Sequence, residues 1–299
     1  MQDKISKWYQ YSKERFPLWQ FFLLCLLFSV SGGLLIQKSL SLSTNSYLPI
    51  LLFFVALFLF LLRLRLFDEF KDLEHDFLYY PQRPVPRGLI KLSELKPVIG
   101  GIIILELLIS FYNGVNSFII FIFTFLYSLI LFKEFFIPAW LKKHFTLYIL
   151  SHELIALPLF FYLFSLNGFK IVQVTQPLFW IICFFFVLQL FLLEITRKIR
   201  SKKEEVASKD TYSAQYGAIG ASLLTVAVAI LVGFIYFRLL INLVGWSKLS
   251  YLPLLFFMLL VRSIFIFMKD NTSKNSRLIF LSTVFFIFAI NFVVILILL

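Results

Sequence analysis

Residues 67–88 read FDEFKDLEHDFLYYPQRPVPRG, and this stretch carries most of the distinctive chemistry of the chain. It contains five of the protein's 16 acidic residues within nine positions. Three of them, Asp68, Asp72 and Asp76, recur every four residues, which on an α-helix places their carboxylates on one face about 6 Å apart. Because like charges at this spacing repel one another, the row predicts bound cations, either Mg²⁺ or neighbouring Lys and Arg side chains.

The sequence around this stretch is strongly apolar, which predicts an integral membrane protein. Of the 299 residues 61% are hydrophobic, and the mean hydropathy is +0.91, far above the usual range for a soluble domain. We predict an all-α polytopic fold with about nine transmembrane helices in a single domain, 1–299, whose residues 1–16 form a cytosolic N-terminal segment. The expected spans are residues 17–37, 46–66, 96–113, 117–134, 145–166, 176–195, 217–241, 251–269 and 278–299.

The distribution of basic residues predicts the orientation. If the N-terminus is in the cytosol, the segments on that side hold 23 of the 28 Lys and Arg residues, and those on the opposite side hold four. In this count the loop after the second span begins at Arg63. The positive-inside rule therefore favours a cytosolic N-terminus and cytosolic polar loops, in what we expect to be a prokaryotic plasma membrane. The net charge of +12 follows from this topology and from contact with anionic lipid, so no nucleic-acid partner is expected.

The acidic row is expected to continue the second spanning helix until Pro81, Pro84 and Pro86 end it. Arg83 and Arg87, held on this stiff turn, could bind phosphate oxygens through bidentate hydrogen bonds. The alternative is a solvated connector in which Lys71 and the arginines only neutralise the acids. The interleaved prolines and arginines favour a functional site, because a merely solvated loop does not need such a rigid geometry.

The row of aspartates followed by Pro81-x-Arg83-Pro84-x-Pro86-x-Gly88 resembles the first signature of the UbiA superfamily of intramembrane prenyltransferases. That signature is written N-x3-D-x3-D with a following P-x-R-P-x-P-x-G, so Asp72 and Asp76 match its two aspartates. Asp68 stands where the family often has Asn. The close match covers about 20 residues, and the nine predicted spans agree with the family's helical architecture.

The resemblance implies a helical bundle around a central cavity that lipid can enter. It also implies Mg²⁺-dependent transfer of a polyprenyl group from a polyprenyl diphosphate to an aromatic or other nucleophilic acceptor, with release of pyrophosphate. Asp72 and Asp76 would hold the metal with help from Asp68, and Lys71, Arg83 and Arg87 would contact the diphosphate. The sequence identifies neither the acceptor, the prenyl chain length nor the oligomeric state.

The second polar loop departs from the family pattern. The family often has D-x3-D at the end of the sixth span, but this chain has Glu194 followed four residues later by Lys198. We expect Glu194 to contribute to metal binding, and Arg197 and Lys198 to neutralise the diphosphate where other members hold a second cation. The alternative is a structural ion pair between Glu194 and Lys198 at helical i,i+4 spacing.

Ionisable residues within the predicted spans are costly and invite a functional explanation. His152, about two turns into the fifth span, is a candidate base for the proton lost by the acceptor, although a structural hydrogen bond would also account for it. Arg262 either reaches a pyrophosphate or extends toward the membrane surface. Glu106 is expected to be a paired structural acid.

Two other functions fit parts of this pattern. A secondary transporter or channel would also use an acidic cation site, but such sites usually lie at the membrane midplane and not in a proline-bounded loop. A phosphoalcohol transferase would carry an Asp-Gly pair in its signature, and no such pair occurs near residues 68–76.

Overall fold

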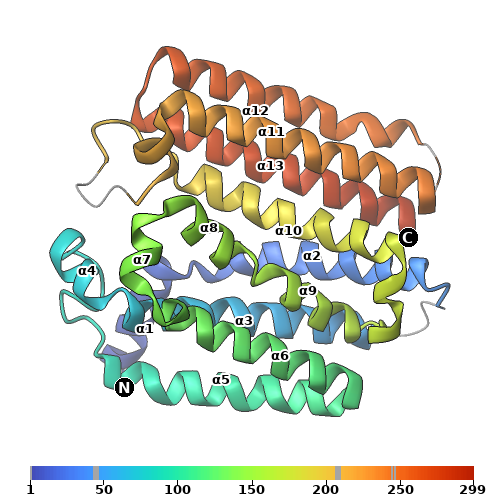
Figure 1. Ribbon diagram of the computed structural model, residues 1–299, viewed down its shortest axis with the longest axis horizontal. Helices are drawn as coiled ribbons and strands as arrows, with labels where there is room; N and C mark the ends of the chain where they lie inside the picture. The colour runs from blue at the N-terminus through green and yellow to red at the C-terminus, as the bar shows by residue number, and fades with distance from the viewer. Residues whose placement is uncertain (1, 43–46, 206–209, 244, 246) are drawn as a thin grey trace. The chain divides into compact units, whose positions relative to one another are not determined.

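The structure is a computed structural model, and it describes residues 2–42, 47–205, 210–243, 245 and 247–299. Every regular element in these ranges is helical (Figure 1). Nine segments of the described chain are long and apolar enough to cross a membrane. The prediction of an all-α polytopic membrane protein is therefore confirmed, and the nine segments fall where the hydropathy of the sequence places them. The central cavity stays a prediction.

The described residues form two compact units. Unit 1 comprises the described residues of 1–29 and 45–171, and unit 2 those of 30–44 and 172–299. Helix α2 (Leu18–Ser39) contributes its first part to unit 1 and its remainder to unit 2. Unit 1 further contains α1 (Gln2–Arg15), α3 (Leu48–Lys71), α4 (Leu73–Tyr79), α5 (Leu92–Tyr112), α6 (Val115–Phe132), η1 (Glu134–Phe136), α7 (Pro138–Lys143), α8 (Phe145–Glu153) and α9 (Ala156–Ser165). The single-domain assignment of residues 1–299 stays a prediction.

A buried ion pair joins three spanning helices of unit 1. Arg63 on α3 donates from Nε to Glu106 Oε2 on α5 at 2.7 Å, and from Nη1 to Ser128 Oγ on α6 at 2.8 Å. Both charged side chains are almost completely buried. Glu106 is thus a paired structural acid, as the sequence indicates. Arg63 was counted above with the loop after the second span, but it lies inside α3. The ion pair with Glu106 neutralises its guanidinium, which allows the arginine to be buried there.

The fifth span is broken in the middle. Helix α8 ends at Glu153 and α9 begins at Ala156, with a turn at residues 154 and 155. Pro158 accounts for the break, since it has no N–H to donate to the carbonyl of Leu154 and its ring collides with that carbonyl. The Thr124 hydroxyl on α6 donates to the Pro158 carbonyl at 2.8 Å, which fixes the broken segment against α6.

Unit 2 contains four spanning helices and two short 3₁₀ segments. They are η2 (Ile171–Thr175), α10 (Pro177–Arg197), α11 (Tyr212–Leu243), η3 (Lys248–Tyr251), α12 (Leu252–Lys269) and α13 (Ser273–Leu298). Helices α12 and α13 pack along each other (Figure 1). Helix α11 is interrupted at Gly217, whose φ of 70° is accessible at little cost only to glycine.

Polar side chains join the helices of unit 2 inside its apolar core. Asn291 on α13 donates to the side-chain oxygen of Gln189 on α10 and accepts a 2.8 Å hydrogen bond from Ser31 on α2. All three are completely buried. Ser263 on α12 and Ser282 on α13 lie 2.7 Å apart between their hydroxyl oxygens. Such interhelical hydrogen bonds specify which faces of the helices meet when the surroundings are uniformly apolar.

Candidate functional site

The acidic row lies where α3 passes into α4. Helix α3 ends at Lys71, Asp72 adopts φ −96° and ψ 11°, and α4 begins at Leu73, so the row does not lie on one continuous helix as expected. Asp has a low helix propensity, and repulsion between neighbouring carboxylates disfavours further winding. The four-residue register nevertheless survives the break, because the Asp72 N–H donates to the Asp68 carbonyl at 2.9 Å and the Asp76 N–H to the Asp72 carbonyl at 2.7 Å.

Asp68 and Asp72 form the accessible part of the row. Each side chain is 37% exposed, and the Lys71 ammonium lies 3.5 Å from Asp68 Oδ1 and 4.0 Å from Asp72 Oδ1. Both carboxylates therefore approach one cation position. Partial burial of Asp72 raises the pKa of its carboxyl to about 6, opposed by Lys71 and reinforced by repulsion from Asp68 and Asp76.

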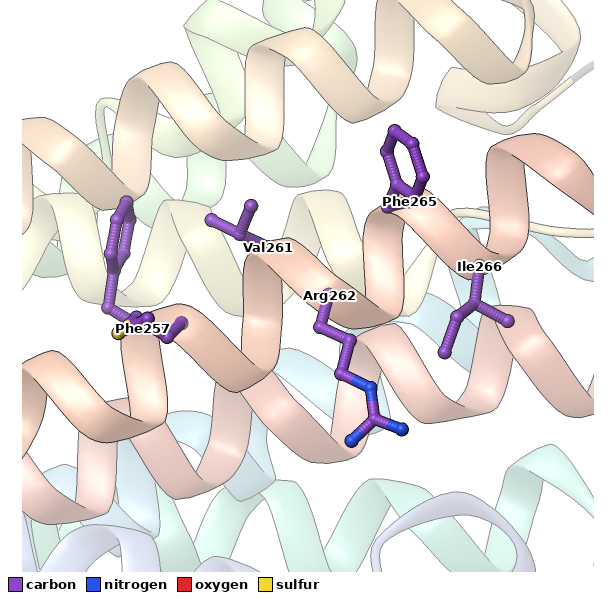
Figure 2. A pocket seen from close by; sticks show the side chains of 6 residues that line it. Phe257, Val261, Arg262, Phe265 and Ile266 are labelled. Atoms are coloured by element: carbon purple, nitrogen blue, oxygen red, sulfur yellow. The ribbon is translucent and has the colours of Figure 1, made fainter.

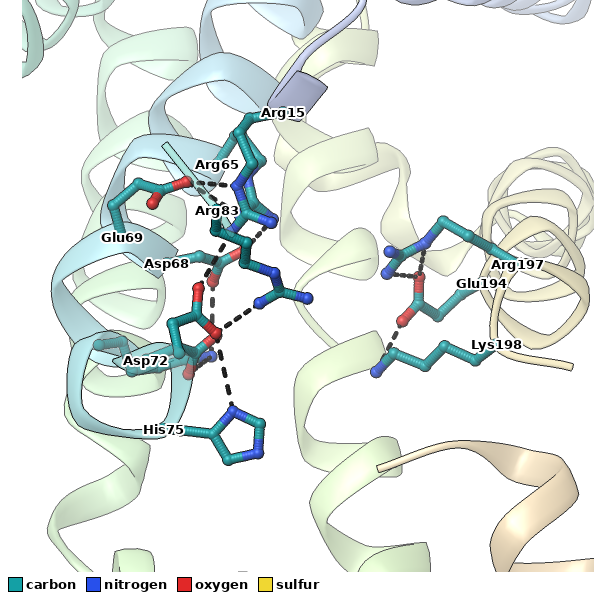
Figure 3. Close-up of polar contacts among 12 residues, drawn as sticks. Arg15, Arg65, Asp68, Glu69, Asp72, His75, Arg83, Glu194, Arg197 and Lys198 are labelled. Atoms are coloured by element: carbon teal, nitrogen blue, oxygen red, sulfur yellow. Dashed lines mark hydrogen bonds and ion pairs between the residues drawn. The ribbon is translucent and has the colours of Figure 1, made fainter. Parts of the chain in front are cut away.

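Asp76 differs from the other two because it is buried and already neutralised. Its side chain is 3% exposed. Arg83 forms an ion pair with its Oδ1, and Arg15 Nη2 lies 3.5 Å from its Oδ2 (Figure 3). Two guanidinium groups thus converge on one carboxylate. Arg83 comes from the proline-rich turn that follows α4, whereas Arg15 comes from the N-terminal helix α1.

Glu69 and Arg15 are site residues that the sequence analysis missed. Glu69 Oε1 accepts hydrogen bonds from Arg15 Nε at 2.7 Å and Arg65 Nη2 at 3.0 Å, and its side chain is 1% exposed. The four-residue spacing of Arg65 and Glu69 could have indicated their pair. The contribution of Arg15 could not be found that way, because 54 residues separate it from Glu69 and only the docking of α1 brings them together.

The turn after α4 is held by backbone hydrogen bonds and by buried side chains. The Arg83 N–H donates to the Tyr80 carbonyl and the Leu89 N–H to the Pro84 carbonyl, at 3.0 and 2.9 Å. Gly88 takes φ 79°, a conformation that favours glycine. The buried side chains Val85 and Ile90 anchor the turn in the apolar core of unit 1.

Arg83 and Arg87 leave this turn toward different partners. The Arg83 guanidinium lies 3.8 Å from the centre of the Tyr80 ring, which holds it over Asp76. Arg87 instead donates two 2.8 Å hydrogen bonds to Glu14 on α1, and this contact holds the pKa of the Glu14 carboxyl below its usual value. Lys7 on α1 also pairs with Glu94 at the start of α5. Helix α1 is therefore attached to the acidic segment by several charged contacts.

His152 lies in the last turn of α8. Its Nδ1 is 2.7 Å from the Tyr148 carbonyl oxygen, and its ring stacks on the Tyr148 ring. Because a carbonyl can only accept, Nδ1 carries the proton in the neutral ring, and Nε2 is then the basic nitrogen. Tyr148 interacts electrostatically with Lys71 and Asp72, so the helix that carries His152 borders the acidic row.

Glu134 also borders the row and was missed. It is buried and interacts electrostatically with Lys71. Glu134, Phe135 and Phe136 take φ values of 47°, 55° and 60°, so three consecutive residues other than glycine adopt the left-handed conformation. Each costs roughly 1–2 kcal/mol, and nothing in the local sequence indicates this strain.

The second predicted site lies at the end of α10 in unit 2. Glu194 Oε2 accepts from Arg197 Nη2 at 2.6 Å and from Nε at 3.0 Å, and Lys198 Nζ lies 2.9 Å from Glu194 Oε1 (Figure 3). The contact between Lys198 and Glu194 is the i,i+4 ion pair of the structural alternative, and the i,i+3 pair between Arg197 and Glu194 adds to it. Arg197 keeps 58% of its side-chain surface exposed and can still approach an anion.

The donor chemistry of the acidic row fits Mg²⁺. Among the described residues, no three His, Cys, Asp or Glu side chains form a group that could hold a metal by themselves. Mg²⁺ commonly takes only one or two carboxylates and completes its octahedron with water and substrate phosphates. Asp68 and Asp72 meet this requirement, since both are accessible and both already face a cationic ammonium group.

Comparison with known proteins addresses the fold. No protein-family model matches this sequence, and no curated protein matches it significantly. A solved structure of digeranylgeranylglyceryl phosphate synthase superposes with a TM-score of 0.60 and 17% identity over 98% of this chain and 99% of that chain. The apo structure of a UbiA homolog from Aeropyrum pernix K1 superposes with a TM-score of 0.68 and 13% identity over 92% and 98%. The chain has the UbiA fold.

This UbiA fold confirms the resemblance that the first signature suggests. The confirmation extends over nearly the whole chain, whereas the motif covers about 20 residues. The UbiA fold does not favour the alternative of a transporter or channel. At these identities the likeness concerns the architecture, so the roles of the individual residues rest on their chemistry in this chain.

Proposed function

We propose that this protein is a membrane prenyltransferase that moves a polyprenyl group from a polyprenyl diphosphate to an aromatic or other nucleophilic acceptor. One observation carries the proposal. In a chain with the UbiA fold, the three aspartates keep a four-residue register, and two arginines from separate elements converge on the third. Carboxylates for a metal and guanidinium groups for phosphate are thus assembled side by side.

In this proposal Asp68 and Asp72 would hold Mg²⁺ together with Asp76. The bound ion would supply positive charge to the departing diphosphate oxygens. Lys71, which faces Asp68 and Asp72, would contact the diphosphate beside this site. This refines the sequence-based expectation, in which Asp72 and Asp76 were the principal ligands.

Arg83 and Arg15 bind the diphosphate through charge-assisted hydrogen bonds. Their guanidinium groups are already held beside the acidic row by Asp76 and Glu69, so little conformational entropy remains to be lost on binding. Arg87 is farther along the turn, on Glu14, and its role is to anchor α1 or to contact the outer phosphate. The charge that develops on the leaving group is stabilised by groups that are positioned beforehand.

The reaction breaks the bond between C1 of the prenyl chain and the bridging oxygen, and the electron pair leaves with pyrophosphate. The acceptor forms a new bond to C1 and loses a proton. His152 Nε2 is the proposed base, because Nδ1 donates to the Tyr148 carbonyl and keeps the ring in the required tautomer. The acceptor is not identified by these residues.

Arg197 and Lys198 are proposed to bind the diphosphate in place of a second metal ion. Their pairing with Glu194 leaves one net positive charge on this end of α10. A cation of the protein would thus neutralise the charge that a bound metal neutralises in a D-x3-D motif. Glu194 positions the two basic side chains, and its carboxylate would also be available as a metal ligand.

Binding of a fluorescent farnesyl or geranylgeranyl diphosphate to the purified full-length protein tests the proposal. The variants are Asp72→Ala and Asp76→Ala, and the matched control is Glu74→Ala, an exposed acid of the same segment. We expect Mg²⁺-dependent binding to wild type and to the control, and at least a tenfold loss in both aspartate variants. Prenyl transfer to a panel of aromatic acceptors follows as the activity assay.

Two outcomes would reject the proposed function: binding that is independent of Mg²⁺, and full retention of diphosphate affinity by both aspartate variants. An ion flux in liposomes that these variants abolish would indicate a transporter instead. The role of Arg197 is tested separately, because an Arg197→Ala protein with unchanged diphosphate affinity would exclude its replacement of a metal while leaving the first site intact.

A further inference from the structure

Arg262 occupies an unusual position for an ionisable residue. It lies in α12, seven residues before the end of the span Lys248–Lys269, and its side chain is exposed. Figure 2 shows the guanidinium extending away from the helix. A charged group within a membrane span normally faces a partner inside the protein, because hydrocarbon cannot solvate it. The buried Arg63 of another span, α3, has such a partner in Glu106.

Arg262 has no such partner in the part of the chain that the structure describes. No ion pair or hydrogen bond of its side chain occurs there. An anion from outside the described residues can therefore serve as its counter-charge. At this depth, about two helical turns from the end of the span, the available anions are the phosphates of membrane lipids, which an arginine side chain can approach by extending along the helix.

An apolar groove accompanies the charge. It has a volume of about 580 Å³ and is lined by Phe257, Met258, Val261, Phe265 and Ile266 together with Arg262 (Figure 2). Met258 and Phe265 are 68% and 58% exposed, so the groove is open on its outer side. A surface that offers one cation beside an open row of apolar side chains matches a molecule with an anionic head and a hydrocarbon tail.

A second cation lies along the same helix. Lys269 follows Arg262 by seven residues, which returns it to a similar face about 10 Å farther along the axis. Its ammonium lies 4.7 Å from the centre of the Phe265 ring, which itself lines the groove. One cation, Arg262, thus lies among the apolar side chains of the groove, and the other, Lys269, lies at the end of the span.

We propose that this face of α12 binds an anionic phospholipid. The lipid phosphate pairs with Arg262 and is approached by Lys269, and one acyl chain lies in the groove from Phe257 to Ile266. The inference does not depend on prenyl transfer, because the residues belong to α12 alone and the proposed function gives none of them a role in binding the diphosphate.

The test measures lipids retained by the full-length protein. Protein in detergent is titrated with phosphatidylglycerol or phosphatidylcholine of the same acyl chains, and bound lipid is counted by native mass spectrometry. The variants are Arg262→Gln and Lys269→Gln. Arg238→Gln is the matched control, since Arg238 is an exposed arginine of another span, α11.

We expect wild type and Arg238→Gln to bind phosphatidylglycerol at least tenfold more tightly than phosphatidylcholine. Arg262→Gln should remove this preference, and Lys269→Gln should reduce it by a few fold without affecting folding, because both residues are exposed. Equal binding of the two lipids by wild type, or an unchanged preference in Arg262→Gln, would overturn the proposal. The proposal would also be overturned if Arg262→Gln lost prenyl diphosphate binding but kept its lipid preference, because Arg262 would then belong to the substrate site.

Discussion

Removing Glu106 should be among the most destabilising single changes in this protein, because it leaves the Arg63 guanidinium buried without its counter-charge. The pair is joined by a 2.7 Å hydrogen bond, and the two side chains are 0% and 1% exposed. Two unit charges about 4 Å apart attract by roughly 4 kcal/mol at an effective dielectric constant of about 20. Breaking a buried pair from one side typically costs about 3–5 kcal/mol, so we expect that loss for Glu106→Leu.

The opposite single change should cost less. Arg63→Met leaves a carboxylate that can become neutral by taking up a proton, whereas an arginine cannot lose its charge. The Arg63→Met substitution also removes the contacts of the guanidinium with the rings of Phe60, Phe67 and Phe125, so some destabilisation remains. The double variant Arg63→Met/Glu106→Leu has no buried charge and should lie within about 1 kcal/mol of wild type.

Equilibrium unfolding by SDS in mixed micelles, followed by tryptophan fluorescence, gives the free energy of unfolding of all four proteins. The control is Ser128→Ala, which removes the acceptor of Arg63 Nη1 and the hydroxyl's own hydrogen bond to the Phe125 carbonyl while leaving the ion pair intact, and it should cost about 1 kcal/mol. The double-mutant cycle should give a coupling energy of at least about 2 kcal/mol. If the losses of the two single variants simply add in the double variant, the pair does not stabilise the protein and the reasoning is refuted.

Three further predictions concern the acidic row and the turn beside it. Mg²⁺ affinity in calorimetric titrations should fall as the pH drops through about 6, where Asp72 takes up a proton, and a flat profile between pH 5 and 7.5 would contradict this. Arg15→Gln should raise Mg²⁺ affinity, because it removes one of the two guanidinium groups paired with Asp76, and yet weaken polyprenyl diphosphate binding about tenfold; equal losses of both would indicate only structural damage. Gly88→Ala should lower the free energy of unfolding by about 1 kcal/mol, because the residue has a φ of 79°. The control Gly100→Ala, inside α5 with open space around it, should be neutral or stabilising by about 0.5–1 kcal/mol. Equal effects of the two substitutions would rule out backbone strain as the cause.

Much of the fold could be predicted from the sequence because membrane helices leave a strong local signal. A run of about 20 apolar residues is enough to mark a span, since the backbone must satisfy its own hydrogen bonds in hydrocarbon. The broken fifth span is a partial exception. Pro158 is visible in the sequence, but the prediction treated residues 145–166 as one helix, and Thr124 supports the break from another element.

The candidate site was predictable where its residues are close in sequence. Asp68, Asp72 and Asp76 are linked by helical spacing, and Arg83 by the turn that follows. Arg15, Glu69 and Glu134 were not found, because their relation to the row depends on how α1 and η1 dock. Arg87 was expected to bind phosphate, but in the structure it is paired with Glu14 on α1. The local sequence does not indicate this pair, because 73 residues separate the two side chains.

The membrane-spanning helices and the register of the acidic row follow from the local sequence, because both depend on the chemistry of residues within a few turns of one another. How each charge is balanced depends instead on the packing of distant segments. Arg63 proved to be a buried partner of Glu106, and Asp76 is held by Arg15 as well as Arg83. Charges in a low-dielectric interior must be neutralised by whichever opposite charge packing brings near, and packing joins residues that the sequence keeps far apart.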